Sequence, residues 1–515
     1  MAQMERVVEK SERTLVRGIL PWHVSLIALG GIIGSCYFLG LGLTFSEMGP
    51  GAVLLAYAIA GLTIYGVMQS FAELLVNIPR RGSFVSYTRE FLGDTASAGI
   101  GWAFWCNWVV YIPSEALATA VFMDYFVKLP FENPAWSTFV WGIVALALLT
   151  LVNIYRVKFF GHVESIMAII KILAIVVFVL CGVLIWLGII GGNLNPYTEG
   201  GFIGTKILLG GEGGVIEKLF PAGGLVIITY MIWTLVNFQG SEIVGLSAAE
   251  TQDPEVNVPL ACRRVATRII LIYLIPVFVL TLIMPYYEAG LDESIFAYTL
   301  GVYGLKWAAG LFTIVTLVAA FSCANSGLYG TVRSLYGLSV EGLAPKFLSN
   351  LNIFNTPQNA TIFTIVPIWL VYLLGFASDV LGLWGEEGLP LYANMLGISG
   401  FTGTLCWVGI CWSQVVFRKR LKQRGYDPEK VLTVKAKWYP GLAYFAIILQ
   451  VASMILLVFE DGGMPVFVIS VIVIFVPILI YAIQKKRGKI RTVVTLGADE
   501  VSFDEKFPPL NNTDK

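Results

Sequence analysis

The sequence predicts an all-α polytopic membrane protein with twelve transmembrane helices. Of its 515 residues, 57% are hydrophobic and only 13% are charged, a balance more apolar than that of soluble domains. A helix needs about 20 apolar residues to cross the hydrocarbon core of a bilayer, and the chain contains a dozen such runs. The formal net charge is zero, so the overall balance gives no indication of a nucleic-acid partner.

The predicted spans follow one another with short connections. We place them near 22–46, 51–77, 99–126, 136–153, 162–190, 221–247, 265–285, 307–337, 360–380, 390–416, 438–459 and 463–484. The chain then divides into an amino-terminal segment, five spans, a loop, five spans, a basic loop, two spans and a tail, with bounds 1–21, 22–190, 191–220, 221–416, 417–437, 438–484 and 485–515. No connection is long enough for a soluble catalytic domain, so we do not expect an enzyme.

Positive charge alternates between the connections. If the amino terminus lies inside, 29 of the 34 Lys and Arg residues fall on the cytoplasmic side. The opposite loops hold only Lys128, Lys206, Lys218 and Lys306. This bias follows the positive-inside rule, so we expect both termini in the cytoplasm, in a cell membrane such as a bacterial inner membrane.

The first and sixth spans are each interrupted by polar and glycine residues. The interruption in the first span consists of Gly30, Gly31, Gly34 and Ser35. That in the sixth span consists of Asn237, Phe238, Gln239, Gly240, Ser241 and Glu242. Unwound backbone inside a bilayer is tolerated only where it faces protein or lines a cavity, so both breaks are candidate ligand walls. The alternative is that the glycines only permit close helix packing.

The two breaks begin equivalent groups of five spans. An odd number of spans per group means that the second group enters the membrane from the opposite side, which is the inverted-repeat design of many secondary transporters. Freed amides at the start of a half-helix suit a carboxylate, and freed carbonyls at the end of the preceding half suit an ammonium group. This pair of sites fits an α-amino acid zwitterion.

Several motifs in order resemble the amino acid/polyamine/organocation permease superfamily, specifically its amino acid transporter branch. They are Phe38-Leu39-Gly40, Pro79 to Tyr87, Ile170-Lys171-Ile172, Phe238 to Pro259, and Ala324 to Pro345. The resemblance implies a five-plus-five inverted repeat with two added helices, and uptake of amino acids that is often driven by protons.

The resemblance also assigns parts of the substrate site. It implies that the substrate carboxylate is recognised at Gly34, Ser35 and Cys36, and the α-amino group at carbonyls near Ile32 and Phe238. Gln239 and Gly240 belong to the same sixth-span wall. Many relatives have a second glycine where this chain has Cys36, so we expect its side chain to narrow the pocket or shift the amide.

Lys171 is the only Lys or Arg residue that lies well inside a predicted span rather than near one of its ends. It lies about 13 Å into the fifth span at about 1.5 Å per residue, near the bilayer centre, where a charge is costly and marks a functional hypothesis. The resemblance implies a proton-responsive site, with candidate partners Ser322, Ser326, Gly30 and Gly31. The alternative is a permanently charged tether to the first span.

Three further residues carry open interpretations. Glu242 either gates the inner half of the protein or shapes the substrate site, or it caps freed amides of the sixth-span break. Glu115, in the third span, is either a counter-charge for a cationic substrate or a structural hydrogen-bonding group. Trp233 is either a lid over the substrate or, as we favour for so aromatic a chain, a lipid-facing or interfacial residue.

These observations together favour a proton-coupled amino acid symporter. An amino acid or polyamine exchanger and an amino acid-sensing receptor remain alternatives, and the sequence leaves the particular substrate and the oligomeric state open. The seven cysteines lie in apolar stretches without a C-x-x-C pair, so we interpret them as packing residues. We expect no cofactor and no metal, with a proton gradient as the energy source.

Overall fold

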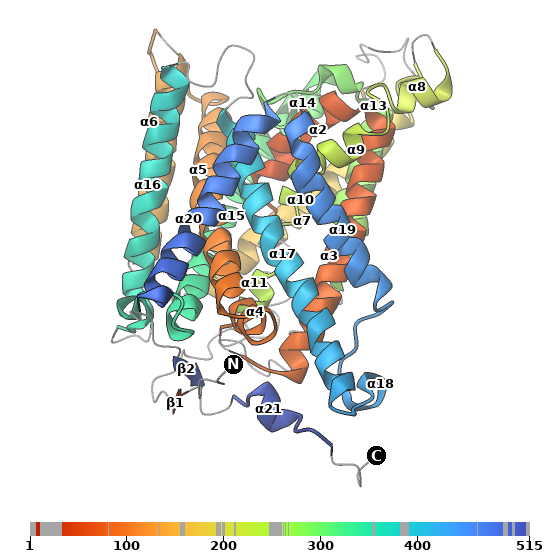
Figure 1. Cartoon of the computed structure of the whole chain (residues 1–515). Coiled ribbons are helices and arrows are strands. Elements are labelled where there is room, and N and C mark those ends of the chain that lie inside the picture. Colours follow the sequence, from red (N-terminus) through yellow and green to blue (C-terminus); the bar gives the residue numbers. More distant parts are fainter. Residues whose placement is uncertain are drawn as a thin grey trace.

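The computed structural model describes a bundle of long helices that run between two ends of the molecule (Figure 1). The described residues are 7–10, 33–80, 82–132, 134–154, 160–191, 197, 201–210, 213–246, 260, 262, 264–265, 267–352, 356–381, 391–460, 462–487, 493–496 and 500–510.

The long helices account for the predicted spans. They are α3 (Pro50–Asn77), α5 (Asp94–Asp124), α6 (Pro134–Ile154), α7 (Phe160–Trp186), α13 (Ile275–Ile283) preceded by η6 (Ile269–Leu274), α15 (Lys306–Val340), α16 (Gln358–Val380), α17 (Leu391–Gln423), α19 (Gly441–Leu456) and α20 (Gly463–Lys486). Every predicted span except the first and the sixth thus contains a continuous helical segment. Among the described residues, eight helices are long and apolar enough to cross a membrane.

The described parts of the first and sixth spans consist of shorter pieces. The described part of the first contains η2 (Cys36–Gly40) and α2 (Leu41–Met48), and the sixth contains α9 (Val226–Thr229), α10 (Met231–Val236) and α11 (Ile243–Leu246). Both interruptions fall where glycine and polar side chains replace the apolar run. Glycine weakens a helix and polar side chains compete for its backbone groups, so local sequence accounts for both positions.

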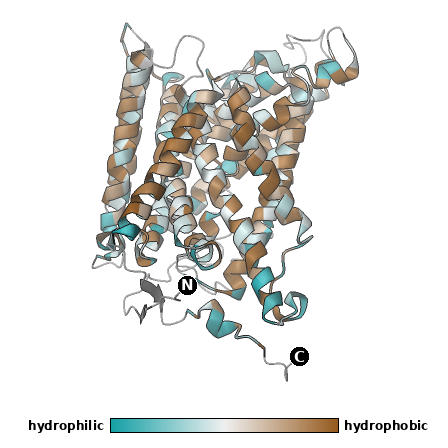
Figure 2. Cartoon of the chain, in the orientation of Figure 1, coloured by the Kyte–Doolittle hydropathy of each residue, from teal (hydrophilic) through white to brown (hydrophobic). Residues whose placement is uncertain are grey.

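The interior of the bundle is built around α5, which packs against both α15 and α17. The outer helices turn apolar side chains outward, as Leu370 and Leu374 do on α16 and Phe475 and Leu479 on α20. Figure 2 shows this hydrophobic character on the outer helices, with hydrophilic residues gathered at the ends of the bundle. An apolar exterior of this kind suits a bilayer.

Shorter helices occupy several connections. They are α4 (Phe84–Leu92), α8 (Val215–Leu219), η7 (Tyr286–Glu288), α14 (Ile295–Val302), η8 (Lys346–Ser349), α18 (Pro428–Val431), η9 (Leu457–Phe459) and α21 (Phe503–Lys506). We expected only connections around α4 and α14. Both are too short to appear in a search for apolar runs of bilayer length, although α4 buries most of its residues against α5 and α17.

Two short strands depart from a purely helical fold. β1 (Val7–Lys10) pairs in parallel with β2 (Val493–Leu496), with Val7 opposite Val493. Both strands lie at the same end of the bundle as α18 and α21 (Figure 1). Both strands lie in the terminal segments outside the predicted spans, and each needs a partner far away in the sequence for its backbone hydrogen bonds.

Candidate functional site

The break in the first span exposes a backbone amide to a carboxylate. Ile33 and Gly34 are not helical, and the amide of Ser35 donates to both carboxylate oxygens of Glu115 on α5, at 3.1 and 3.0 Å. A Cβ at Gly34 would lie 2.2 Å from Oε1 of Glu115 and 2.7 Å from Sγ of Cys323. Glycine is therefore needed for this contact, and the anion position at the break holds a carboxylate of the protein itself.

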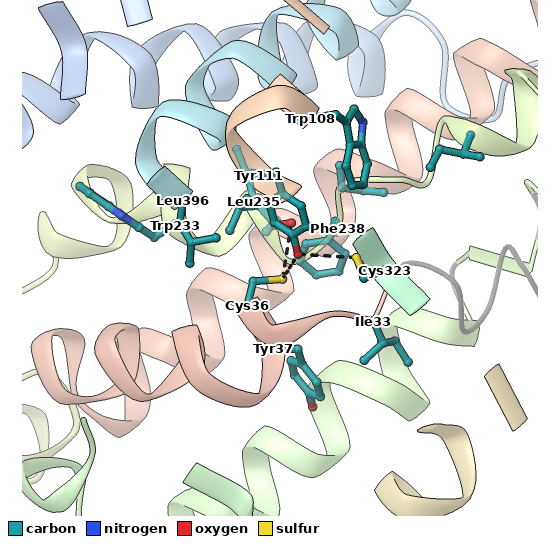
Figure 3. Packing of buried hydrophobic residues seen from close by; sticks show 14 of the residues in the cluster. Ile33, Cys36, Tyr37, Trp108, Tyr111, Trp233, Leu235, Phe238, Cys323 and Leu396 are labelled. Atoms are coloured by element: carbon teal, nitrogen blue, oxygen red, sulfur yellow. Dashed lines mark hydrogen bonds between the residues drawn. The ribbon is translucent and has the colours of Figure 1, made fainter. Parts of the chain in front are cut away.

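The side chains of Ser35 and Cys36 connect this break to neighbouring helices. Oγ of Ser35 lies 2.9 Å from Oη of Tyr392 on α17. The hydroxyl of Tyr111 donates to Sγ of Cys36 at 3.0 Å, and the thiol of Cys323 donates to the same hydroxyl at 3.6 Å (Figure 3). The Cys36 side chain thus fills space beside the break with a polarisable sulfur that Tyr111 holds in place.

The break in the sixth span lies against the first. The residues between α10 and α11 form turns, and Gly240 has a φ of +92°, which favours glycine. Glu242 accepts the amide N–H of Gly240 at 3.1 Å and the indole N–H of Trp407 at 2.9 Å, so both of its oxygens are engaged within the protein. The carbonyl of Val236 lies 4.0 Å from Sγ of Cys36, which brings the two breaks together.

The side chains of Phe238 and Gln239, both in the sixth-span break, contact different neighbours. The ring of Phe238 is fully buried and its centroid lies 4.5 Å from that of Tyr273. The side-chain amide of Gln239 donates to the carbonyl of Ser399 on α17 at 2.9 Å. The hydroxyl of Ser399 lies 2.9 Å from Oε1 of Gln239 and also hydrogen-bonds Oδ1 of Asn107 on α5. Gln239 therefore belongs to a polar cluster that joins three elements.

Trp233 corrects one of our interpretations. Only 2% of this residue is exposed, so it faces neither lipid nor the interface. Its indole N–H donates to the carbonyl of Ala393 on α17 at 3.0 Å, and its ring centroid lies 5.2 Å from that of Tyr230. The part of the sixth span that precedes its break is largely apolar on all sides, so its sequence does not reveal which face packs inward.

Lys171 is fully buried beside the first-span break. Its ammonium group donates to the carbonyl of Ile33 at 3.1 Å and to Oγ of Ser322 on α15 at 2.8 Å. The hydroxyl of Ser326, the other candidate partner, is buried and is not among the hydrogen-bond partners of Lys171. Three other residues of the expected site, Gly30, Gly31 and Ile32, lie outside the described residues.

Comparisons with known proteins agree with this geometry. The family model described as amino acid permease matches residues 23–492. The chain belongs to the amino acid permease family. It is 32% identical over 485 residues to a putative histidine permease of Bacillus subtilis (strain 168), covering 94% of this chain and 97% of that protein. It is 32% identical over 444 residues to the lysine-specific permease LysP of Escherichia coli (strain K12), covering 84% and 85%.

A third relative is named for a different substrate from the first two. The γ-aminobutyric acid permease of Bacillus subtilis (strain 168) is 30% identical over 484 residues, covering 93% of this chain and 96% of that protein. The family and the apolar helices indicate that this permease is a multi-pass membrane protein, a transporter rather than an enzyme, and that its substrates are amino acids. The superfamily that the sequence motifs resemble is therefore the correct one.

The permease also buries an acid that sequence reasoning missed. Glu164 on α7 is fully buried, and the hydroxyl of Ser322 donates to its Oε1. A charged residue two turns before Lys171 on the same helix was the available signal, but its position near the start of the predicted span made it resemble a loop residue. Ser322 therefore contacts a base and an acid at once.

The titratable residues that the structure describes do not gather into a metal site. In the part of the chain that the structure describes, no three His, Cys, Asp or Glu residues are placed to hold a metal ion. The buried carboxylates of Glu115 and Glu242 are instead held by backbone amides and, for Glu242, by an indole N–H.

Proposed function

We propose that the permease imports α-amino acids together with protons, by alternating access. The single observation that carries this proposal is the contact between the buried ammonium group of Lys171 and the carbonyl of Ile33, at 3.1 Å. A buried charge is costly unless it is paired or used, and this one touches the backbone at the edge of the expected substrate site. Loss of its proton would weaken that contact and so link protonation to the shape of the break.

The substrate carboxylate would bind at the Ser35 amide and displace Glu115. That amide already binds a carboxylate at hydrogen-bonding distance, which supports its assignment as an anion site. Two carboxylates cannot share it without repulsion, so Glu115 must move away or carry a proton when substrate is present. The α-amino group would then bind carbonyls near Ile32 and Phe238, with Cys36, Gln239 and Gly240 shaping the remaining walls.

The proposed transport cycle uses an inverted repeat of residues 22–190 and 221–416, with two added helices in 438–484. The approach of Val236 to Cys36 supports a shared midplane site for the two repeats, because each residue directly adjoins the break of one repeat. In this arrangement both termini face the cytoplasm. The membrane would be a bacterial inner membrane.

The test is uptake of pooled radiolabelled amino acids into proteoliposomes of the purified permease, with and without an inside-alkaline pH gradient. We expect accumulation of one class of amino acid only with the gradient. Uptake that ignores the gradient but requires amino acid inside the vesicles would reject symport and make the permease an exchanger. Saturable binding without any flux would instead indicate a receptor.

Lys171→Ala provides the companion measurement. If protonation of Lys171 couples the gradient to transport, this variant loses gradient-driven accumulation. A variant that accumulates substrate with the pH dependence of the unsubstituted permease would exclude the coupling role and leave Lys171 as a tether.

A further inference from the structure

Glu164 and Lys171 share one buried face of α7. They are seven residues apart, which is two helical turns and about 10 Å along the axis at about 1.5 Å per residue. Both are fully buried. Ile170, Leu173 and Val177 of the same helix are exposed, so the apolar face points out of the bundle and the two charges point in.

The hydroxyl of Ser322 on α15 forms hydrogen bonds with both Lys171 and Glu164, and the two bonds have the same donor-to-acceptor direction. Lys171 Nζ donates to Ser322 Oγ at 2.8 Å, and Ser322 Oγ in turn donates to Oε1 of Glu164. Each hydrogen bond runs from a group that can lose a proton to one that can accept it. This is the arrangement required for transfer through a hydroxyl group.

Few other titratable groups compete for this proton. The helices packed against α7 are α13, which has no titratable side chain, and α15, which contributes Cys323. Glu115 on α5 also acts on the Lys171 charge, but its carboxylate is held by the Ser35 amide. Among the described residues, Glu164 is the carboxylate connected to Lys171 through a single hydroxyl group.

We propose that Glu164 accepts the proton that Lys171 releases and passes it toward the start of α7. The N–H bond of the ammonium breaks as its proton moves to Ser322 Oγ, while the hydroxyl proton of Ser322 moves to Oε1 of Glu164. The products are a neutral amine, an intact hydroxyl and a carboxylic acid. The net charge of the buried pair stays at zero, which avoids leaving one unpaired charge in the interior.

The step has a direction because Glu164 lies in the first two turns of α7, at the end expected to face the cytoplasm. Its carboxyl group is buried, and Ser326 and Asn325 of α15 also interact with it, so polar side chains of α15 stabilise the group that accepts the proton. The inference rests on the proposed symport and assigns the inward proton exit of that same site.

Glu164→Gln is the decisive variant. Glutamine keeps a carbonyl oxygen for the Ser322 hydroxyl but cannot carry the transferred proton. We expect gradient-driven accumulation in proteoliposomes to fall about 100-fold, the lower range for loss of a general acid or base. Exchange of external substrate against preloaded substrate should persist, because exchange does not require release of the proton inside.

Two further variants separate relay from structure. Ser322→Ala removes the bridging hydroxyl while keeping both charges, and should lose net uptake but retain exchange. Ser334→Ala is the matched control, because Ser334 is buried on the same helix and its hydroxyl has no hydrogen bond to a described residue. Monodispersity and thermal unfolding of each purified variant report on folding.

The outcomes are distinct. Gradient-driven accumulation that survives in Glu164→Gln would overturn the relay while leaving symport intact. Equal loss of accumulation and exchange in Glu164→Gln and in Glu164→Asp, with normal folding, would assign Glu164 a structural role instead. Absence of gradient-driven accumulation in the unsubstituted permease would reject the proposed function itself, and the relay with it.

Discussion

At the scale of single residues, contacts at the first-span break decide what the site can bind. The Ser35 amide faces Glu115, and Gly34 makes room for that carboxylate. These are close contacts in a packed interior, where even one added methyl group is felt. Substitutions here should therefore affect transport more strongly than their chemical size suggests.

Gly34→Ala should impair uptake strongly. The new Cβ would lie 2.2 Å from Oε1 of Glu115, and overpacking of this kind costs about 1–3 kcal/mol. Uptake and thermal unfolding should both be measured. Gly441→Ala is the control, because a Cβ there meets no atom within 4 Å; equal behaviour of the two variants would contradict the expectation.

Glu115→Gln should lower the KM for the amino acid substrate. A neutral amide oxygen accepts the Ser35 N–H more weakly than a carboxylate does, so the competitor for the substrate carboxylate is weakened. Initial rates of uptake over a range of substrate concentrations test this. A large rise in KM would mean that Glu115 helps to hold substrate rather than competing with it.

At the scale of elements, buried ion pairs join helices at the end of the bundle that carries α18. Arg418 on α17 binds both carboxylate oxygens of Glu73 on α3, at 2.8 and 2.7 Å. Glu73 also accepts from the side chain of Gln414 and from the backbone amide of Ala436. The carboxylate thereby fastens α3, α17 and the following loop to one another.

Arg418→Met should destabilise the permease by about 3–5 kcal/mol, because it leaves the buried charge of Glu73 unpaired. Replacing both partners, as in Glu73→Gln with Arg418→Met, should recover part of the loss. Lys485→Met is the surface control, since the Lys485–Asp94 pair is 3.5 Å long and Lys485 is exposed; such pairs contribute about 0–1 kcal/mol. Thermal unfolding in detergent would show a similar loss for both single variants if burial did not matter.

At the scale of the whole molecule, the two ends of the bundle differ in what they present. α8 lies at one end, while α18, β1, β2 and α21 lie at the other (Figure 1). The distribution of basic residues in the sequence predicts that the α18 end is cytoplasmic. Orientation is therefore testable with single exposed positions.

Cysteine labelling from one side of the membrane should separate Glu217→Cys on α8 from Lys430→Cys on α18. Both native residues are exposed. In intact cells, a membrane-impermeant maleimide should label the first variant, and the second only after permeabilisation. The unsubstituted permease gives the background from its native cysteines. The reverse pattern would invert the predicted topology.

Much of the fold could be predicted because it depends on local composition. Apolar runs located the helices, and glycine with polar residues located both interruptions. The same reasoning missed α4 and α14, which are shorter than a span, and the β1–β2 pair, whose partners are far apart in sequence. Length and local periodicity carry no information on contacts of that kind.

The sequence by itself determined where the helices and their breaks lie, that Lys171 is buried near mid-span, and which superfamily the chain resembles. Only the tertiary structure decided that Trp233 packs against α17 and that the carboxylate of Glu115 accepts the Ser35 amide N–H. It also decided that the Ser322 hydroxyl forms hydrogen bonds with both Lys171 and Glu164. The physical reason is that a helix with apolar residues on all sides does not reveal its inward face. That face is set by the helices packed around it, and the chemistry of the site follows from the side chains they bring together.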